Sequence, residues 1–495
     1  MQKIIHQDKS TTPWMVYSVL LFLFVTRLLT MTLMPLNDKT EARYGEIARM
    51  MLESHNWVTL LQTPNEPFWA KPPLSTWSSA LSMKVFGVHA FAARLPAMIY
   101  ALAILGLVGW FVRQRYSKQH CYYVWLILAS MPYFFINAGV VMTDPAFVFA
   151  ITLCMISAWL AVSHASKVWG GLFFIGLGLG LLAKGPLTGV LVLLPLIIWT
   201  MIERKYHYVW KNLPWIWGSV LTLLIALPWY GLAELRTPGF LHYFIVGEHF
   251  GRFVESGWLG DKYGFAHAFP FGMIWVFLLG ATVPWVLLVI YDVLVQSKRR
   301  QVVIGARDGW VTYLMCFILV PLIFFTFSRN IIYTYTFTVL PPLALLIVEG
   351  IQRQFLPTLT LKRCAWVASS VGTCCVLLSL FLFIRPALVS KSQERVVHVW
   401  QSFHPHSKLI YWANEPDFSA RFYAHGRVQA TRDEHALLEW LQQPHHQYLV
   451  VRQDQLNEIS EGLRRRWRPA AHIQVQNKVF ILYEIRSRLV HKAFV

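Results

Sequence analysis

Long apolar stretches recur along the chain, and they constrain its fold more than any other feature. Runs such as residues 14–34 and 91–112 approach the roughly 20 apolar residues with which a helix crosses a bilayer. In a chain of 495 residues of which 56% are hydrophobic, this recurrence is typical of a membrane protein. The sequence therefore predicts an α-helical polytopic membrane protein.

The apolar stretches divide into eleven predicted spans, and one or two further spans or re-entrant pieces within 168–202 would bring the total to about 11–13 helices. The first span follows a short head with Lys3 and Lys9 and lacks a small-residue cleavage site, which favours an anchor over a removable signal peptide. The predicted spans lie near residues 14–34, 91–112, 120–140, 145–163, 168–183, 187–202, 213–233, 271–295, 308–327, 333–350 and 364–385.

The basic residues indicate how the chain is oriented. The formal net charge is +19, but the basic residues lie mostly between spans, which favours contact with anionic membrane lipid and gives no reason to expect nucleic acid as a partner. If the N-terminus is cytoplasmic, the short cytoplasmic loops are the basic ones, as the positive-inside bias requires. These loops carry Arg113, Arg115, Lys118, Lys167, Arg204, Lys205, Lys298, Arg299, Arg300, Arg353, Lys362 and Arg363.

The opposite, outer side of the membrane receives the loops with the most polar chemistry. Under the same alternation, residues 35–90, 234–270 and 328–332 lie there together with Asp144. Within the first of these loops, the segments ARYGEIARMMLESHNW and LSTWSSALSMKVFG repeat apolar residues at helical spacing. We expect two amphipathic helices there that lie along the membrane interface.

A change in composition after about residue 388 predicts two domains. Residues 1–387 are expected to form the transmembrane domain, and residues 388–495 a soluble outer α/β domain. Short β-like runs (LIYWA, YLVVR and VFILYEI) alternate there with the helical patterns EHALLEWLQQ and QLNEISEGLRRRW. The six cysteines of the chain show no CxxC or Cys/His spacing, so we expect neither a disulfide framework nor a zinc cluster.

Two kinds of polar side chain gather on the predicted outer side. Carboxylates can take or orient a proton, and cations can hold a departing oxyanion. A site that pairs the two beside the bilayer suits a lipid-linked phosphate as substrate. The carboxylates are Asp38, Glu41, Glu46, Asp144 and Glu248, and the cationic or hydrogen-bonding groups are Arg43, Lys71, Lys184, His249, Arg252, Arg329 and Tyr335.

Several of these residues also have purely structural interpretations, which the residue pattern leaves open. Asp38 and Glu41 lie at a helix start, where a negative charge favours the positive helix N-terminus. Asp144 precedes a proline at the start of a span and is a natural N-cap. Lys71 and Lys184 lie beside apolar runs, where a lysine can simply extend its charge to the interface.

The later outer loops carry the same ambiguity. Glu248, His249 and Arg252 follow one another closely in an aromatic-rich segment, which is typical of an interfacial helix. Glu248 with His249 is also a candidate metal pair, although two ligands alone are a weak signal. Arg329 and Tyr335 are either phosphate ligands or interface anchors.

Six motifs occur in an order that resembles one known family. They are TEARYGEIARMM, FWAKPP, the pair Thr143 and Asp144, LLAKGP, PWY followed by PGFLHYFIVGEHFGRF, and SRNIIYTY before LPPLALL. Over about the first 350 residues the chain resembles the ArnT family of aminoarabinose transferases. That family lies within the glycosyltransferase-C superfamily, which also holds the protein O-mannosyltransferases.

The resemblance implies a multi-pass enzyme of the bacterial inner membrane with its active site and C-terminal domain in the periplasm. It would move a sugar from an undecaprenyl-phosphate carrier to lipid A or lipopolysaccharide, with inversion at the anomeric carbon. By the same resemblance, Lys71 would hold the donor phosphate, and Arg43, Tyr44, Lys184, Arg329 and Tyr335 would complete that pocket. Asp38, Glu41 and Asp144 would be catalytic, and Glu248, His249 and Arg252 would belong to the acceptor loop.

The sequence departs from the family pattern at two positions. Thr40 stands where relatives commonly carry Asp before the Glu of the first loop, so either Asp38 or Glu41 takes the place of the catalytic acid. Ala70 stands where an acid often precedes the phosphate-binding lysine. A divalent metal would lose a ligand at Ala70, so we expect no required cofactor. Two alternatives are transfer to a protein hydroxyl, as in O-mannosylation, and a lipid-sugar flippase or transporter.

Overall fold

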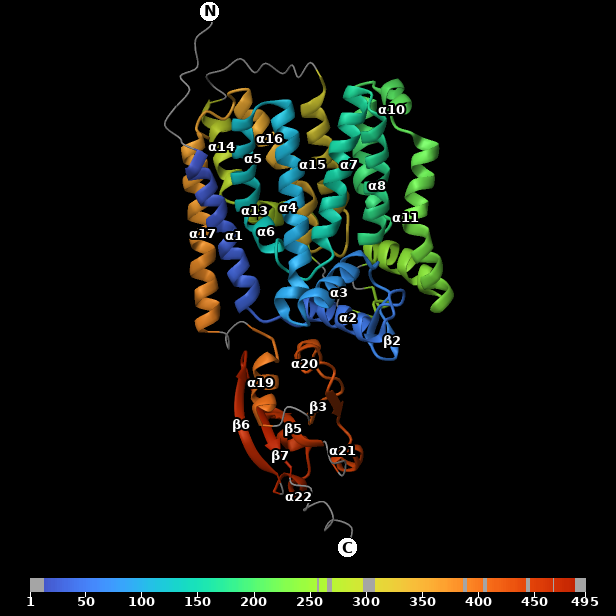
Figure 1. Ribbon diagram of the computed structural model, residues 1–495, viewed down its shortest axis with the longest axis vertical. Coiled ribbons are helices and arrows are strands. Elements are labelled where there is room, and N and C mark those ends of the chain that lie inside the picture. Colours follow the sequence, from blue (N-terminus) through green and yellow to red (C-terminus); the bar gives the residue numbers. More distant parts are fainter. Residues whose placement is uncertain are drawn as a thin grey trace, which may run out of the picture.

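The computed structural model of the protein describes residues 13–255, 258–264, 269–296, 308–385, 390–403, 407–441, 446–465 and 467–485. A long helical bundle carries a smaller α/β unit at one end, and the first helix starts at the far end (Figure 1). The expected domain boundary at residue 387 lies outside the described residues.

Each of the eleven predicted spans contains helix. Among the described residues, seven helices are long and apolar enough to cross a membrane, and a bent pair makes an eighth. The helices of the bundle are α1 (Pro13–Leu33), α4 (Ala90–Arg115), α5 (Lys118–Ser130), α6 (Pro132–Asn137), α7 (Asp144–His164), α8 (Lys167–Lys184), α9 (Leu187–Ile202), α10 (Tyr206–Asn212), α11 (Trp215–Arg236), α13 (Met273–Thr282), α14 (Trp285–Gln296), α15 (Trp310–Thr326), η3 (Tyr333–Val339), α16 (Leu340–Gln352) and α17 (Leu361–Ile384).

Three predicted spans are not continuous α-helices, and prolines explain two of the breaks. Between α5 and α6, Met131 has extended backbone angles because it precedes Pro132. Helices α13 and α14 meet at an angle of 99° where Val283 precedes Pro284. The span predicted at 333–350 begins as the 3₁₀ helix η3 before it continues as α16.

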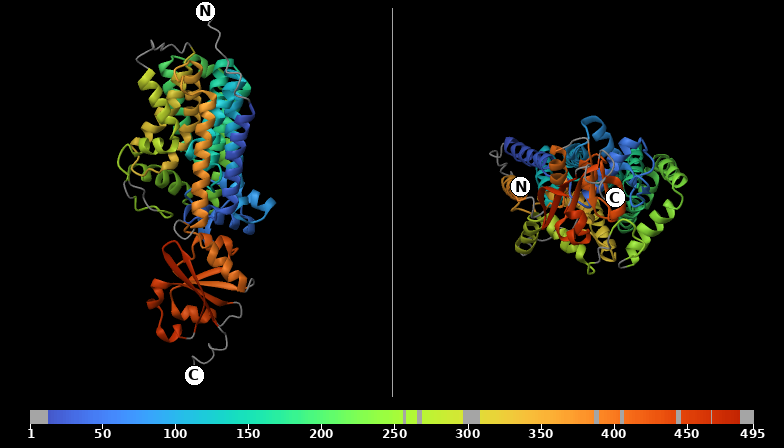
Figure 2. Two further views of the ribbon diagram at one scale, coloured as in Figure 1. Left: turned by 90° about the vertical axis from the view of Figure 1, so that its left-hand side faces the viewer. Right: turned by 90° about the horizontal axis from the view of Figure 1, so that it is seen from below.

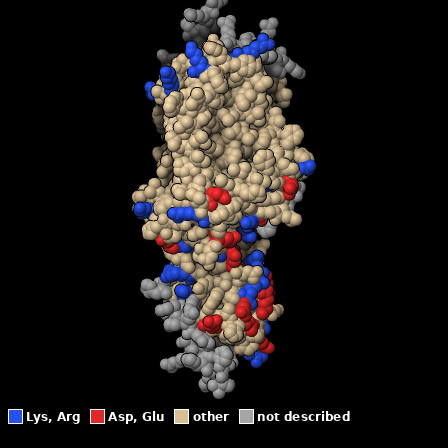
Figure 3. All heavy atoms as spheres, turned by 90° about the vertical axis from the view of Figure 1, so that its right-hand side faces the viewer, with Lys and Arg blue, Asp and Glu red and all other residues tan. Residues whose placement is uncertain are grey.

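The surface of the bundle matches a membrane protein with one basic rim. The face seen in Figure 3 has a broad belt without charged residues, bounded at the end remote from the α/β unit by lysines and arginines. The basic loops predicted to be cytoplasmic lie at that end, apart from Lys298–Arg300, which are outside the described residues. This arrangement is the one that the sequence predicted from its loop charges.

The other end of the bundle is covered by interfacial elements. The two amphipathic helices expected in the first loop are α2 (Thr40–Ser54) and α3 (Leu74–Phe86). A two-stranded hairpin between them, β1 (Leu61–Thr63) and β2 (Glu66–Pro67), was not predicted. A π-helix, η1 (His242–Gly251), and the short α12 (Arg252–Val254) lie in the second large loop. Helices α2, α3 and η1 share a hydrophobic core with the adjoining ends of α8 and α11.

The C-terminal unit is a five-stranded sheet in the order β4-β3-β5-β7-β6. Strand β3 pairs in parallel with β4 and β5, whereas β7 pairs antiparallel with β5 and β6. Alternate residues of each central strand point to opposite faces, so each face has its own core. Its elements are α19 (Glu394–Phe403), β3 (Lys408–Trp412), α20 (Phe418–Tyr423), β4 (Val428–Thr431), α21 (Glu434–Leu441), β5 (His446–Arg452), η4 (Gln453–Glu458), α22 (Glu461–Arg464), β6 (Arg468–Val475) and β7 (Lys478–Glu484).

The predicted strands and one predicted helix of this unit are present. LIYWA, YLVVR and VFILYEI correspond to β3, β5 and β7, and EHALLEWLQQ contains α21. The helix expected over QLNEISEGLRRRW is wrong, because the chain there forms the 3₁₀ turn η4 and the single turn α22.

The C-terminal unit contacts the bundle through α20, which packs against α2 (Figure 2). Phe422 enters the core formed by the first loop. Gly45 permits this close approach, because an added Cβ there would lie 2.9 Å from Leu36 and 3.5 Å from the Phe422 ring. The side chain of Tyr423 accepts a hydrogen bond from the backbone N–H of Leu36 at 2.7 Å.

Candidate functional site

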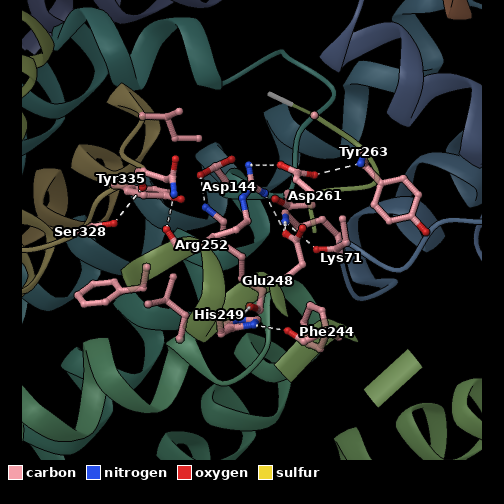
Figure 4. Close-up of a pocket in the computed structure, with 18 of the residues that line it drawn as sticks. Lys71, Asp144, Phe244, Glu248, His249, Arg252, Asp261, Tyr263, Ser328 and Tyr335 are labelled. Atoms are coloured by element: carbon pink, nitrogen blue, oxygen red, sulfur yellow. Dashed lines mark hydrogen bonds and ion pairs between the residues drawn. The ribbon is translucent and has the colours of Figure 1, made fainter. Parts of the chain in front are cut away.

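A cavity of about 460 Å³ lies at the end of the bundle that carries the C-terminal unit. Its walls come from α2, the segment after β2, the starts of α7 and α9, the end of α15, and the loop elements η1 and α12. Among the described residues, four cations and three carboxylates line it (Figure 4). They are Arg43, Lys71, Lys184, Arg252, Asp144, Glu248 and Asp261.

One wall of the cavity is a buried ion pair between two transmembrane helices. Asp144 begins α7, Lys184 ends α8, and Lys184 Nζ donates to Asp144 Oδ1 at 2.6 Å. The lysine nitrogen also lies 5.3 Å from the centre of the Phe147 ring and 5.2 Å from that of Tyr335. The cap that Asp144 was alternatively expected to form is therefore replaced by a contact across two helices.

A glycine turn fixes the position of Lys184. Gly185 has φ +78°, a conformation that side chains with a Cβ rarely adopt, and it ends α8. A Cβ at Gly185 would meet the Phe244 ring at 2.5 Å, so η1 packs directly on this turn. The sequence LLAKGP thus places its lysine at the cavity by ending one span and starting the next.

A second part of the cavity lining is a chain of alternating charges. Lys71 Nζ and Arg252 Nη1 both donate to Glu248 Oε2, at 3.1 Å and 3.0 Å. Arg252 Nη2 also lies 3.1 Å from Asp261 Oδ2. Burial alone would raise the pKa of Glu248, but Lys71 and Arg252 outweigh it and hold the pKa below its ordinary value. The carboxylate is ionised and keeps both cations at the cavity.

His249 is turned toward the protein backbone. Its Nδ1–H donates to the Phe244 carbonyl at 2.7 Å, and Nε2 lies 3.3 Å from the Lys184 carbonyl. Burial lowers the pKa of His249, so the ring is neutral near pH 7. Among the described residues, no cluster of three or more His, Cys, Asp or Glu side chains could hold a metal ion. The carboxylate of Glu248, the other half of the candidate metal pair, is already held by Lys71 and Arg252.

Arg43 and the predicted tyrosines complete the lining. Arg43 donates through Nη1 to the Tyr263 carbonyl, while its Nε is buried and has no partner among the described residues. Tyr44 lines the same wall, with its ring edge-on to Phe68. Tyr335 stacks on a neighbouring ring with centroids 4.4 Å apart. Arg43 is therefore a cavity residue whose guanidinium is held partly by the backbone of the second outer loop.

Asp38, Glu41 and Arg329 are predicted site residues that do not line the cavity. Asp38 lies at the contact with the C-terminal unit, where its carboxylate accepts hydrogen bonds from Ser419. Glu41 pairs with Arg94 through two contacts of 2.8 Å. Arg329 is exposed, with its guanidinium 4.4 Å from the centre of an aromatic ring outside the cavity. Asp38 and Glu41 instead bind partners that are distant in the sequence, and the local residue pattern does not encode these contacts.

The two positions that depart from the family pattern do line the cavity. Thr40 and Ala70 both belong to its wall. The acids near them pair with residues outside the cavity. Glu46, for example, forms a buried ion pair with Arg49 at 2.7 Å. Asp144, Glu248 and Asp261 are therefore the cavity carboxylates among the described residues.

Replacing Glu41 with glutamine is expected to destabilise the protein by about 3 kcal/mol without changing kcat of the folded fraction. The change leaves the Arg94 guanidinium buried without its counter-ion. Chemical unfolding in detergent, with activity normalised to folded protein, measures both effects. Glu53→Gln on the same helix is the control, because its carboxylate is about half exposed. Full stability with lost activity would instead make Glu41 catalytic.

The pKa of Asp38 gives a pH-dependent prediction. Burial, followed by repulsion from Asp417, raises the pKa of Asp38 to about 7, so the folded protein binds a proton there that the unfolded chain releases near its ordinary value of 3.8. This contribution to stability is present at low pH and is lost as pH rises to about 7. Between pH 5 and 7.5, the melting temperature of wild type should fall relative to that of Asp38→Asn. Parallel melting curves for the two proteins would contradict the assignment.

The sequence analysis missed two residues of importance here. Asp261 lines the cavity, and its only signal was an acid within the second outer loop. Arg94 ties the first loop to α4, and a single arginine inside an apolar span was a usable signal, because such charges have partners within the protein.

Comparisons with known proteins agree with this architecture. The family model described as dolichyl-phosphate-mannose-protein mannosyltransferase matches residues 16–244. The undecaprenyl phosphate-alpha-4-amino-4-deoxy-L-arabinose arabinosyl transferase of Enterobacter sp. (strain 638) is 27% identical over 74% of this chain and 65% of its own length. That of Erwinia tasmaniensis is 26% identical over 80% of this chain and 70% of its own length. The chain thus spans about two thirds of the length of these relatives.

A solved structure shares the fold over most of the chain. The crystal structure of ArnT from Cupriavidus metallidurans bound to undecaprenyl phosphate superposes with a TM-score of 0.76 at 17% identity, covering 96% of this chain and 98% of that one. The fold is that of a polytopic membrane protein, with a polar cavity at one end of its helical bundle. The chain is thus similar in sequence to these arabinosyl transferases and shares the fold of an ArnT structure.

Proposed function

We propose that the protein transfers a sugar from an undecaprenyl-phosphate carrier to lipid A or lipopolysaccharide. The observation that carries this proposal is the cavity in which Lys71, Lys184, Arg43 and Arg252 face a common space beside the membrane-spanning helices. A cluster of cations in such a place suits the phosphate of a membrane-bound carrier. The names of the arabinosyltransferase relatives support undecaprenyl phosphate as that carrier.

The cavity supports a single displacement at the anomeric carbon. The acceptor oxygen forms a bond to that carbon while the bond to the carrier phosphate breaks, which inverts the configuration. The departing phosphate takes the bonding electrons, and Lys71 with the guanidinium of Arg43 stabilises its added charge. A lipid A phosphate is already ionised near pH 7 and requires no base, whereas Asp144 would serve as base for a hydroxyl acceptor.

The same proposal assigns the cavity to the periplasm. Under the positive-inside bias, the basic rim at the far end of the bundle faces the cytoplasm. The cavity and the C-terminal unit lie at the other end. A bacterial inner-membrane protein so oriented meets lipid A precursors on the periplasmic leaflet.

A transfer assay tests this function and separates it from its alternative. The mannosyltransferase family match favours a protein acceptor as the second candidate. Membranes containing the protein are incubated with labelled undecaprenyl-phosphate sugar, lipid A and a periplasmic protein extract. We expect label in lipid A, and mass spectrometry of lipid A from cells with and without the gene gives the added mass. Label in protein favours the alternative, and label in neither overturns the proposal.

A further inference from the structure

The C-terminal unit contacts a residue of the cavity wall. Phe418, the first residue of α20, holds its ring centre 5.4 Å from the guanidinium carbon of Arg43. Arg43 lines the cavity, whereas Phe418 does not. A residue 375 positions further along the chain therefore restricts a cavity cation by a cation–π contact.

The Phe418 ring is one part of a cage around Arg43. The ring of Phe68 lies 5.9 Å from the same guanidinium carbon, and the Tyr263 carbonyl accepts a hydrogen bond from Nη1. The first loop supplies Phe68, the second loop supplies Tyr263 and the C-terminal unit supplies Phe418. Three separate segments therefore fix the guanidinium of one residue that lines the cavity.

Ser419, the residue after Phe418, fixes the position of the contact between Phe418 and Arg43. The backbone N–H of Ser419 donates to Asp38 Oδ1 at 3.1 Å, and its hydroxyl donates to Asp38 Oδ2. Ser419 is buried, and Phe422 on the same helix lies in the core of the first loop. The position of the Phe418 ring is thus determined by the junction between the two parts of the protein.

We infer that Phe418 is a positioning residue for the carrier phosphate, through which the C-terminal unit completes the donor site. This inference rests on the proposed function, because it takes Arg43 as a phosphate ligand. The Phe418 ring restricts the rotation of the guanidinium before the phosphate binds. Without the ring, phosphate binding must itself remove that rotational freedom, which lowers the affinity for the donor. Since Arg43 would hold the phosphate before and during transfer, the main effect falls on donor affinity.

The test compares variants of the full-length protein in lipid nanodiscs. Phe418→Ala is expected to weaken undecaprenyl phosphate binding and raise KM for the lipid-linked sugar about 10-fold, with a smaller change in kcat. Phe418→Tyr keeps an aromatic face and should retain both values. Phe403→Ala is the matched control, because Phe403 is a half-exposed ring on α19 of the same unit that stacks on Tyr448.

A double variant separates positioning from general loosening of the junction. In an Arg43→Gln background, Phe418→Ala should cause no further loss of binding, since the ring acts through the guanidinium. Additive losses, or wild-type values for Phe418→Ala, would overturn the inference. Binding is measured independently of transfer, so wild type that binds the carrier but transfers nothing refutes the proposed function alone. Wild type that does not bind undecaprenyl phosphate overturns both.

Discussion

Replacing Lys71 with alanine is expected to lower kcat/KM for the lipid-linked sugar about 100- to 1,000-fold. The lysine supplies a positive charge at the cavity, and its Nζ is held there by Glu248 at 3.1 Å and by the Ala70 carbonyl at 2.6 Å. The leaving phosphate gains charge as its bond to the sugar breaks, so the loss falls on the transition state. The effect should be the same for a phosphate and a hydroxyl acceptor, because both release the same carrier phosphate.

Two further variants isolate the role of Lys71. Lys71→Arg keeps the charge but not the compact shape of an ammonium group, so partial activity is expected. Lys262→Ala is the control for a nearby lysine, since Lys262 is exposed and its Nζ lies over the Trp69 ring at 4.6 Å. Steady-state transfer in nanodiscs measures all three. Lys71→Ala with activity close to that of Lys262→Ala would remove Lys71 from the site.

Replacing Asp144 with asparagine is expected to abolish transfer and to destabilise the protein by about 3–5 kcal/mol. The substitution leaves Lys184 buried between two helices without its counter-ion. The neighbouring Phe147 and Tyr335 rings offer only cation–π contacts, which are too weak to compensate for a lost carboxylate. Thermal unfolding in detergent and the transfer assay report the two losses separately.

The double variant Asp144→Asn with Lys184→Met distinguishes stability from chemistry. Removing both charges should restore most of the melting temperature, since a buried ion pair can be replaced by apolar groups with little loss. Transfer should remain absent, because the cavity has lost a cation and a carboxylate together. An active double variant would show that the pair serves only to join α7 and α8.

The sequence predicted the membrane architecture because its signal is repeated and local. Each span is an apolar run that can be recognised without knowing its neighbours, and the loop charges orient the whole set. The breaks at Met131 and Val283 were not predicted, although the proline that follows each residue is visible in the sequence. An apolar run long enough to cross a membrane predicted one continuous helix, whereas proline disfavours helical backbone at the preceding residue.

In the C-terminal unit, burial explains which strands could be predicted. Strand β3 buries four of its five residues and was found as an apolar run, whereas β4 and β6 are mostly half-buried or exposed edge strands. Edge strands carry the weak alternation of a sheet that meets solvent on one side. The short helix α20 had no apolar repeat long enough to be recognised, although it makes the contact with α2.

The candidate site was predictable where one motif both positions a residue and ends an element. Lys184 in LLAKGP and Asp144 before Pro145 are such cases, and both line the cavity. Asp38 and Glu41 were candidates because the first loop is dense in charge, and the family resemblance implied a catalytic role for them. Their partners, Ser419 and Arg94, lie 381 and 53 residues further along the chain, so no local pattern reveals these contacts.

The central claim is that this cavity holds the phosphate of a polyprenyl carrier at Lys71. A cryo-electron microscopy structure of the protein in nanodiscs with undecaprenyl phosphate tests it most directly. The account predicts phosphate density within hydrogen-bond reach, about 3 Å, of Lys71 Nζ, with the Arg43 guanidinium in contact with the same group. Phosphate density outside the cavity, beyond reach of both side chains, would contradict it.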